Sequence, residues 1–375
     1  NPRNAAAGSL KLQDSSLVAK RNLQFMPYDV YTETPLFTNH YEAMMKAKEW
    51  GAPVTPYIRL CHGLNEVKQF IDEYETKRDQ LPFGIDGVVI KVNSYQLQKQ
   101  LGSTAKYPRW AVAFKYKPEQ ALTQIISVDF QVGRTGVITP VANLNPVFIS
   151  GTTVKRVTLH NFDFVKQNDI HVKDYVWIEK SGEIIPKVVK VEIDKRPPDA
   201  SPVLPPKFCP VCNSPTIYNL GEPFVYCPNE KTCPPQLLGK LQHFISKDAM
   251  DIETLGEGKI ELLFRKGLVK SPADLYDLKY DQLLGLENEY ESSDGKIRKV
   301  RFQQKTVENI LKSIEKSKLK PFDRVLYALG IKNVGSIMAK NIANYAKSLD
   351  RLMQMSKEEL IQIPDVGAIT AQSII

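Results

Sequence analysis

The sequence has no long apolar run and few cysteines, and both shortages narrow its class. No segment approaches the ~18 to 20 uninterrupted apolar residues that a membrane-spanning helix needs, and no charged-then-apolar leader opens the chain. Four of the five cysteines fall between positions 209 and 233, too few and too clustered for the disulfide framework of a small secreted protein. We therefore expect a cytoplasmic protein without a membrane partner.

A large excess of charge of one sign is also absent. The 50 lysines and arginines against 42 aspartates and glutamates leave a formal charge of +8, which favours a polyanionic partner without proving one. The 375 residues, 42% hydrophobic and 25% charged, are ordinary globular material for about two to four domains. Because the chain begins with Asn1 and stops at Ile375 within an apolar helical pattern, we expect both ends to be cuts.

The first 118 residues mix two kinds of apolar pattern. Residues 41–50 and 64–74 have the spacing of amphipathic helices, whereas residues 87–92 and 110–116 have the composition of buried strands. This part is therefore predicted to be α+β or α/β.

Residues 122–193 alternate as strands do. Val128, Phe130 and Val132 fall on one face, and short strands with Gly-containing turns predict a small barrel. The Pro-rich stretch 196–206 is too stiff and too poor in N–H donors for a core element, so we expect a linker there.

Behind that linker lies a cysteine cluster. Cys209 and Cys212 are separated by two residues, and Cys227 and Cys233 by five. Four thiolates complete the tetrahedral coordination of Zn²⁺ and leave no position for water, so the sequence predicts a structural rather than a catalytic zinc site. Ligation would also stabilise a segment too short to fold alone. Free thiols or an iron–sulfur cluster are the alternatives.

After Pro235 the pattern becomes helical, with Gly-bearing turns that suggest repeated hairpins. Gly335 precedes a helix predicted at 336–345, and Gly367 precedes one at 368–375. In such a hairpin the exposed N–H groups of the following helix can bind a DNA phosphate without reading bases. Ordinary glycine-capped helix ends are the alternative for any single turn.

Two further turns extend this series. Residues 255–258 precede a helix predicted at 259–264, and residues 283–285 precede one at 306–314. The second is enlarged by residues 287–304, which are rich in charge and lack an apolar period. Lys332, Lys340 and Lys347 would add salt-sensitive attraction to duplex DNA.

Two lysines end predicted strands that are otherwise apolar. Lys91 closes residues 85–92, and Lys115 occupies the same place in residues 110–116. An ammonium that emerges from a buried strand needs a partner, and a phosphate suits its compact charge. The alternatives are a carboxylate such as Asp86 or Glu119, or a side chain that reaches the surface.

Four short segments carry a resemblance to a known family. They are Asn1-Pro-Arg-Asn-Ala-Ala-Ala-Gly-Ser-Leu10, Asp86 to Lys91, Trp110 to Tyr116, and Val132-Gly-Arg-Thr-Gly136. In this order, and followed by the cysteines and the hairpins, they resemble successive signatures of bacterial NAD-dependent DNA ligases. The resemblance covers essentially the whole chain.

The resemblance implies a multi-domain α+β fold in four parts. These are the C-terminal part of an adenylation (nucleotidyltransferase) domain at 1–119, an OB-fold β-barrel at 120–196, a four-Cys zinc finger at 205–235, and a truncated all-α helix-hairpin-helix domain at 236–375. Such ligases seal nicks between a 5' phosphate and a 3' hydroxyl in DNA replication and repair. An enzyme lysine first takes AMP from NAD and passes it to the 5' phosphate.

The chain also departs from the family pattern at three points. The K-x-D-G motif of the nucleophilic lysine does not occur in these 375 residues, so we expect that this chain alone does not take up AMP. The chain also stops before the small C-terminal BRCT domain that the family usually carries. Lys11 stands where the family usually has an arginine, which loses a bidentate fork.

Individual roles follow by match to the family motifs. The catalytic roles fall to Lys91, Lys115 and Asp86, and the nucleotide contacts to Lys91, Lys115, Arg78 and Arg3. The DNA contacts fall to Lys11, Arg134, Gly330, Gly335 and Gly367.

The implied cofactors and partners are NAD, structural Zn²⁺, Mg²⁺ or Mn²⁺, and nicked duplex DNA, bound by a monomer. The competing hypothesis is a zinc and helix-hairpin-helix adaptor that binds duplex DNA without chemistry.

Overall fold

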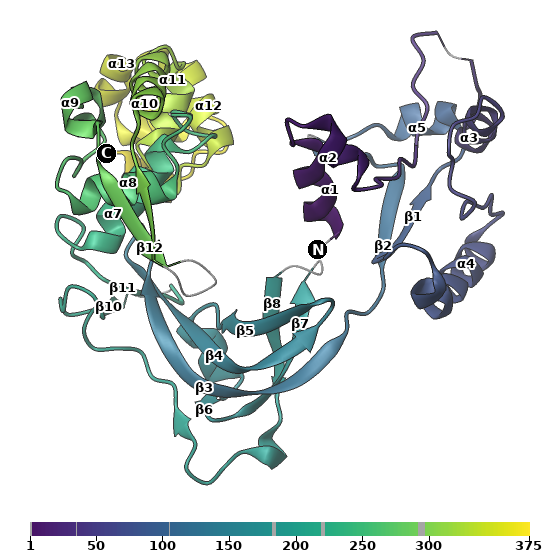
Figure 1. The fold of residues 1–375 in the computed structure, drawn as a ribbon, viewed down its shortest axis with the longest axis horizontal. Coiled ribbons are helices and arrows are strands. Elements are labelled where there is room, and N and C mark those ends of the chain that lie inside the picture. Colours follow the sequence, from purple (N-terminus) through teal and green to yellow (C-terminus); the bar gives the residue numbers. More distant parts are fainter. Residues whose placement is uncertain (1, 35, 105, 182–184, 219–221, 292–296) are drawn as a thin grey trace. The chain divides into compact units, whose positions relative to one another are not determined.

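The computed structural model describes residues 2–34, 36–104, 106–181, 185–218, 222–291 and 297–375. The chain divides into two compact units, both of which contain helices and strands (Figure 1). Unit 1 comprises residues 1–124, 144–157 and 175–195, and unit 2 comprises residues 125–143, 158–174 and 196–375. Among the described residues, no helix is both long and apolar enough to cross a membrane.

The first 119 residues form helices around one short sheet, as the mixed pattern predicts. The helices are α1 (Pro2–Leu10), α2 (Ser15–Ala19), α3 (His40–Glu49), α4 (Leu64–Lys77), the 3-10 turn η1 (Arg78–Gln80) and α5 (Tyr95–Leu101). The two helices predicted from amphipathic spacing are confirmed as α3 and α4. Helix α3 begins where the Asn39 side chain accepts a hydrogen bond from the Glu42 N–H, and it buries Ala43, Met44 and Ala47.

The sheet of this part pairs β1 (Gly87–Lys91) with β2 (Ala111–Lys115), antiparallel. Both predicted strands are confirmed, but the prediction that they are buried is wrong for the described residues. Val89 and Val112 are each 64% exposed. A sheet of only two strands has two free edges and too little covering material to bury both faces.

The middle of the chain forms the predicted barrel. Its strands are β3 (Gln120–Val132), β4 (Val137–Ile149), β5 (Thr152–Thr158), β7 (Tyr175–Ser181) and β8 (Ile185–Val191). They pair in the order β4-β3-β7-β8-β5, and a further pairing of β4 with β5 closes the ring. The sequence alternation did not predict the elements α6 (Phe162–Gln167), β6 (His171–Val172) and η2 (Ile193–Lys195).

The Pro-rich stretch is anchored rather than free. Within it, β9 (Ser201–Pro202) pairs with β6, and Val203 is buried. At its start, Arg196 Nε donates to Asp174 Oδ1 at 2.8 Å, and Asp174 is fully buried. The predicted linker is therefore present, and local strand pairing and an ion pair hold it against its neighbours.

The cysteine-bearing segment adds two short strands to the barrel sheet. They are β10 (Ile217–Tyr218) and β11 (Val225–Tyr226), and β11 pairs with β4 through Val225 opposite Ile138. The cysteines pack in one cluster with Ile138, Phe162 and Val225.

The remainder is helical, as predicted, except for one hairpin of strands. The helices are α7 (Pro234–Ile245), α8 (Glu257–Arg265), η3 (Ala273–Asp277), α9 (Tyr280–Leu283), α10 (Gln304–Ser317), α11 (Phe322–Ala328), α12 (Ser336–Ala346), α13 (Leu349–Gln354), α14 (Lys357–Ile361) and α15 (Ala368–Ile374). The charged enlargement forms β12 (Glu287–Glu291) and β13 (Ile297–Arg301), and Lys299 pairs with Glu289 across the strands at 2.6 Å. Opposite charges on facing positions therefore replace an apolar period there.

Gly87 gives the fold a testable constraint. A β-carbon at this position would lie 1.9 Å from the carbonyl oxygen of Phe114, so only glycine lets β1 and β2 pair here. We expect Gly87→Ala to lower the free energy of unfolding by about 1–3 kcal/mol, measured by urea denaturation. Gly84→Ala is the control, because a β-carbon there meets no atom within 4 Å. Equal midpoints for the two variants would contradict the constraint.

Candidate functional site

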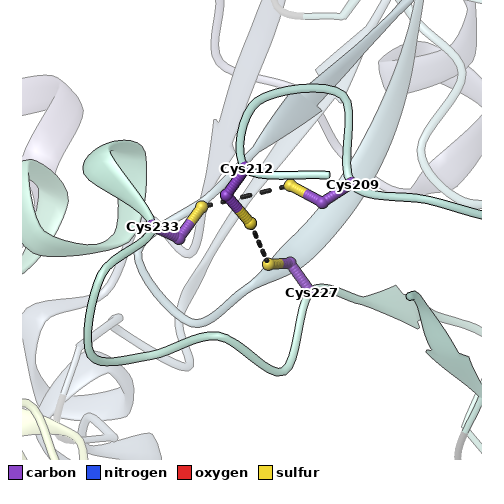
Figure 2. Close-up of side chains that lie close together, drawn as sticks. All are labelled: Cys209, Cys212, Cys227 and Cys233. Atoms are coloured by element: carbon purple, nitrogen blue, oxygen red, sulfur yellow. Dashed lines mark hydrogen bonds between the residues drawn. The ribbon is translucent and has the colours of Figure 1, made fainter. Parts of the chain in front are cut away.

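The four clustered cysteines come from three local structures. Cys209 and Cys212 lie in the loop before β10, Cys227 directly follows β11, and Cys233 is the N-cap of α7. All four sulfur atoms lie within 4.8 Å of one another. Figure 2 shows the four side chains gathered with their sulfur atoms toward one another. The Sγ atoms of Cys209 and Cys233 are 4.0 Å apart, and those of Cys212 and Cys227 are 3.4 Å apart.

These distances fit a single tetrahedral ion. Bonds of about 2.3 Å to zinc separate two sulfur ligands by about 3.8 Å. Thiols this close surround one ion, whereas a cluster of several iron atoms would hold its cysteines further apart. The spacing and the geometry therefore agree on a structural zinc site.

The clustered thiols differ in pKa. Hydrogen bonds with Ser214 lower the pKa of Cys212 to about 6. Burial raises the pKa of Cys227 and of Cys233. Four thiolates at this distance would repel one another, and a divalent cation bound between them would offset that repulsion and stabilise the deprotonated forms.

Lys115 lies with Asp86 and Arg78 at one end of the strand pair. Lys115 Nζ is 2.8 Å from Asp86 Oδ2, so the carboxylate partner considered from the sequence is present. A hollow of about 350 Å³ is lined by polar side chains that include Arg78, Asp86 and Lys115. Both partners of the ion pair are about half exposed, so solvent screens it and it remains able to reorganise around a ligand.

Lys91 lies at the other end in a different environment. Its Nζ donates to the Tyr28 carbonyl at 2.8 Å, lies 3.5 Å from His40 Nε2, and sits 5.2 Å from the centre of the Tyr28 ring. Burial lowers the pKa of Lys91, and the Asp29 carboxylate opposes part of that shift. Burial, and then the charge of Lys91, lower the pKa of His40.

A second hollow, of about 450 Å³, surrounds Lys91. Its lining is mainly apolar and aromatic and includes Tyr28, Tyr41, Tyr57 and Phe70. Tyr28 and His40 were missed from the sequence, because neither stands in a motif. No motif marks either residue in the sequence, and both reach Lys91 only through tertiary packing against the strand that carries it.

The two lysines therefore do not share a hollow in the described part of the chain. Gly87 stands opposite Lys115, and Lys91 stands opposite Ala111, which puts the lysines about 13 Å apart along the strands. Because side chains alternate in direction, both nevertheless project from the same face of the pair. A small anion could therefore not contact both lysines in this geometry, and a longer ligand would be needed to touch both.

The positions of the other residues assigned near the nucleotide are less informative. Arg3 lies in α1, but its side chain is outside the described residues. Lys11 directly follows α1 and is exposed.

Three helices of the hairpin region begin in the same way. Helices α8, α12 and α15 start directly after Gly256, Gly335 and Gly367, whose φ angles are −77°, −83° and −88° and whose ψ angles are 175°, 174° and 173°. A glycine N-cap supplies no side-chain acceptor, so the first N–H groups are left for solvent or an anion.

The turn before each glycine is equally regular. The residue two positions earlier has a left-handed backbone in all three hairpins, namely Thr254 (φ 68°), Asn333 (φ 66°) and Asp365 (φ 67°). The residue between is buried and apolar, namely Leu255, Val334 and Val366. Asn and Asp tolerate this conformation, and that was the sequence signal available for two of the three.

Gly285 and Gly330 do not belong to this set. Gly285 (φ 81°) leads towards β12 rather than into a helix, so the second hairpin predicted from sequence is wrong in its local geometry. Gly330 (φ 69°) follows α11 and forms the turn before Asn333. Lys332 lies 3.4 Å from Glu222, whereas Lys340 and Lys347 are exposed.

Comparison with family models matches the chain in four consecutive parts. Residues 1–119 match the NAD-dependent DNA ligase adenylation domain, and residues 122–200 match the NAD-dependent DNA ligase OB-fold domain. Residues 208–234 match the NAD-dependent DNA ligase C4 zinc finger domain, and residues 324–375 match a helix-hairpin-helix motif.

Similar proteins agree with these matches. The DNA ligase of Cytophaga hutchinsonii is 46% identical over all 375 residues, and that of Flavobacterium johnsoniae is 47% identical over the same length. The DNA ligase of Pelodictyon phaeoclathratiforme is 46% identical. The chain spans about half the length of these curated relatives, 54% in each case.

The zinc site yields a prediction on metal content. We expect Cys233→Ser to lower bound zinc from about one ion per chain to little or none, because three thiolates leave the coordination incomplete. Cys61→Ser is the matched control, since Cys61 lies outside the cluster. Elemental analysis after gel filtration and a thermal melt would measure both. Full zinc content in the Cys233 variant would argue against the four-sulfur site.

Proposed function

Because the chain belongs to the NAD-dependent DNA ligase family, we propose that it works as part of an enzyme that seals nicks in duplex DNA through a ligase–AMP intermediate, in replication and repair. The observation that carries this proposal is the order of the matched domains in one chain. From its few cysteines and its expected partner DNA, we propose a cytoplasmic monomer.

The β1–β2 strand pair supports the part of this proposal that concerns nucleotide binding. A flat apolar base suits the aromatic hollow beside Lys91, and phosphates suit the polar hollow that contains Lys115 and Arg78. An extended nucleotide on the shared face could reach both lysines. The family match gives Lys91 and Lys115 the same role, stabilising charge on the transferring phosphoryl group. In this geometry Lys115, oriented by Asp86, would take that role, and Lys91 would bind the other end of the nucleotide.

Magnesium or manganese would neutralise further charge during these steps. Within the described ranges, the cysteine quartet is the only group of three or more metal-ligating side chains. The divalent ion would therefore be bound mainly through the phosphates of the substrate. Arg3 and Lys11 would approach the nucleotide or the nick, with a lysine in place of the family's usual arginine at position 11.

The helical region supports the part of this proposal that concerns DNA binding. The three matching glycine N-caps and the exposed Lys340 and Lys347 suit phosphates at any sequence. Gly335 and Gly367 would bind phosphate through the following N–H groups, and Arg134 would meet the backbone from the barrel. Gly330 would contribute through the turn that precedes Gly335.

One experiment tests the chemistry. The 375-residue chain is expected to form no covalent AMP adduct with NAD and magnesium, because no K-x-D-G lysine is present in it. A chimera with the N-terminal segment of the Cytophaga hutchinsonii ligase placed before residue 1 is expected to seal nicks with NAD and not with ATP. Intact-mass measurement and a gel assay of a nicked duplex give the readouts. A chimera that binds nicks without sealing them would favour the adaptor hypothesis.

A second experiment tests the DNA contact. We expect the affinity of the chain for nicked duplex to fall steeply with salt, and Lys340→Ala to reduce the slope of log K against log salt by about one. Lys46→Ala, on α3, is the control and should leave the slope unchanged. Fluorescence anisotropy at several salt concentrations would measure this, and a slope near zero in the parent chain would refute the hairpin assignment.

A further inference from the structure

The turn between β3 and β4 is crowded by glycines from other elements of unit 2. The turn runs from Gly133 to Gly136 and carries Arg134 at its tip. Gly136 itself, Gly239 of α7, and Gly330 after α11 all lie where a β-carbon would press on this region. The close approach of three glycines marks a place where backbones must meet.

The first contact fixes the turn to the zinc-binding segment. The Cys227 N–H donates to the Gly136 carbonyl at 2.8 Å, and a β-carbon at Gly136 would lie 2.5 Å from the Cys227 carbonyl oxygen. Gln236, fully buried, donates from Nε2 to that same carbonyl at 3.0 Å and to the Asn229 carbonyl at 3.3 Å. The position of the turn therefore follows from the position of a zinc ligand.

The second contact brings helix α7 against Arg134. A β-carbon at Gly239 would lie 2.8 Å from Arg134 Cβ and 3.1 Å from Arg134 Cα. Glycine inside a helix costs about 1 kcal/mol relative to alanine, so its presence in α7 calls for a packing reason. The approach of Arg134 supplies that reason.

The third contact concerns the guanidinium. A β-carbon at Gly330 would lie 3.1 Å from Arg134 Nη1 and 3.3 Å from the His243 ring. His243 Nε2 lies 2.8 Å from the Tyr327 carbonyl, to which it donates when that nitrogen carries the proton. Burial lowers the pKa of His243, the Tyr327 contact opposes the shift, and the charge of Arg134 adds to it, so a neutral ring lies beside the cation.

Arg134 is also available to a ligand. Its side chain is exposed, and among the described residues no carboxylate forms an ion pair with it. A cation that lies near a neutral ring and a glycine turn, without a counterion among the described residues, is suited to an external anion.

We propose that Gly239, His243 and Gly330 are positioning residues that seat Arg134 beside the turn leading into α12. Arg134 and the N-terminus of α12 then present to the same stretch of DNA backbone, and α7, which begins at the zinc ligand Cys233, sets their spacing. The proposal rests on the proposed DNA-binding function. It assigns α7 a role in positioning a DNA contact, through the close approach of Gly239 to Arg134.

The test adds one methyl group beneath Arg134. Gly239→Ala forces the turn away from α7 without altering charge, and Ala raises helix propensity. Arg134→Ala is expected to weaken binding to nicked duplex about tenfold and to lower the salt slope by about one. Gly239→Ala should reproduce most of both changes with zinc content unchanged, and Gln242→Ala, on the same helix, should change neither.

A double-mutant cycle separates positioning from general damage. In the Arg134→Ala background, Gly239→Ala should cause no further loss of affinity, because the residue through which it acts is already gone. Additive losses, or loss of zinc in Gly239→Ala, would overturn the proposal in favour of a purely structural glycine. If Gly239→Ala does not fold, His243→Ala, which removes the ring that lies with Arg134 beside Gly330, must lower the salt slope in the same way or the proposal fails.

The outcomes also separate this inference from the function beneath it. If Lys340→Ala lowers the salt slope while Gly239→Ala leaves affinity and slope at the parent values, the proposed DNA binding is supported and the proposed positioning of Arg134 is wrong. If neither Arg134→Ala nor Lys340→Ala affects binding, the proposed function is wrong, and the proposed positioning of Arg134 is then wrong as well.

Discussion

Ligation of one zinc ion by Cys209, Cys212, Cys227 and Cys233 is the interaction on which unit 2 depends. Cys227 ends the strand that extends the barrel sheet, and Cys233 starts the helix that enters the helical core through Leu241, Phe244 and Ile245. A segment of about 30 residues with two two-residue strands has too little apolar surface to fix these directions by itself. The metal therefore replaces a core and determines how a sheet continues into a helix.

Backbone geometry, rather than side-chain chemistry, repeats along the helical region. Thr254, Asn333 and Asp365 differ in size and charge, yet each adopts the same left-handed conformation two positions before a glycine N-cap. What the three turns share is a buried apolar anchor and a helix start without a side-chain cap. Exposed N–H groups at three helix starts would suit phosphates rather than bases, as the proposed function requires of a protein that acts at any sequence.

The sequence predicted those features whose cause is local. Cysteine spacing, amphipathic helices and barrel strands all follow from residues close together in the chain, and the structure confirms them. The sequence did not predict the charged strands β12 and β13, because residues 287–304 lack an apolar period and opposite charges pair across the strands instead. It also missed Tyr28 and His40, which reach Lys91 only through tertiary packing. The individual roles of the site residues remain predictions.

The separation of Lys91 from Lys115 follows from strand register and constrains the ligand more than a shared hollow would. Two lysines at adjacent positions could hold any small anion, whereas two on one face about 13 Å apart favour a molecule with an apolar and a charged end. The two hollows differ in the same sense, aromatic around Lys91 and polar around Lys115. A mononucleotide has this polarity along its length, and an inorganic phosphate does not. If the proposed nucleotide binds here, the strand register set by the pairing of Gly87 with Lys115 would fix the length of ligand that can contact both lysines, and the close contact at Gly87 disfavours a shift of that register by one residue.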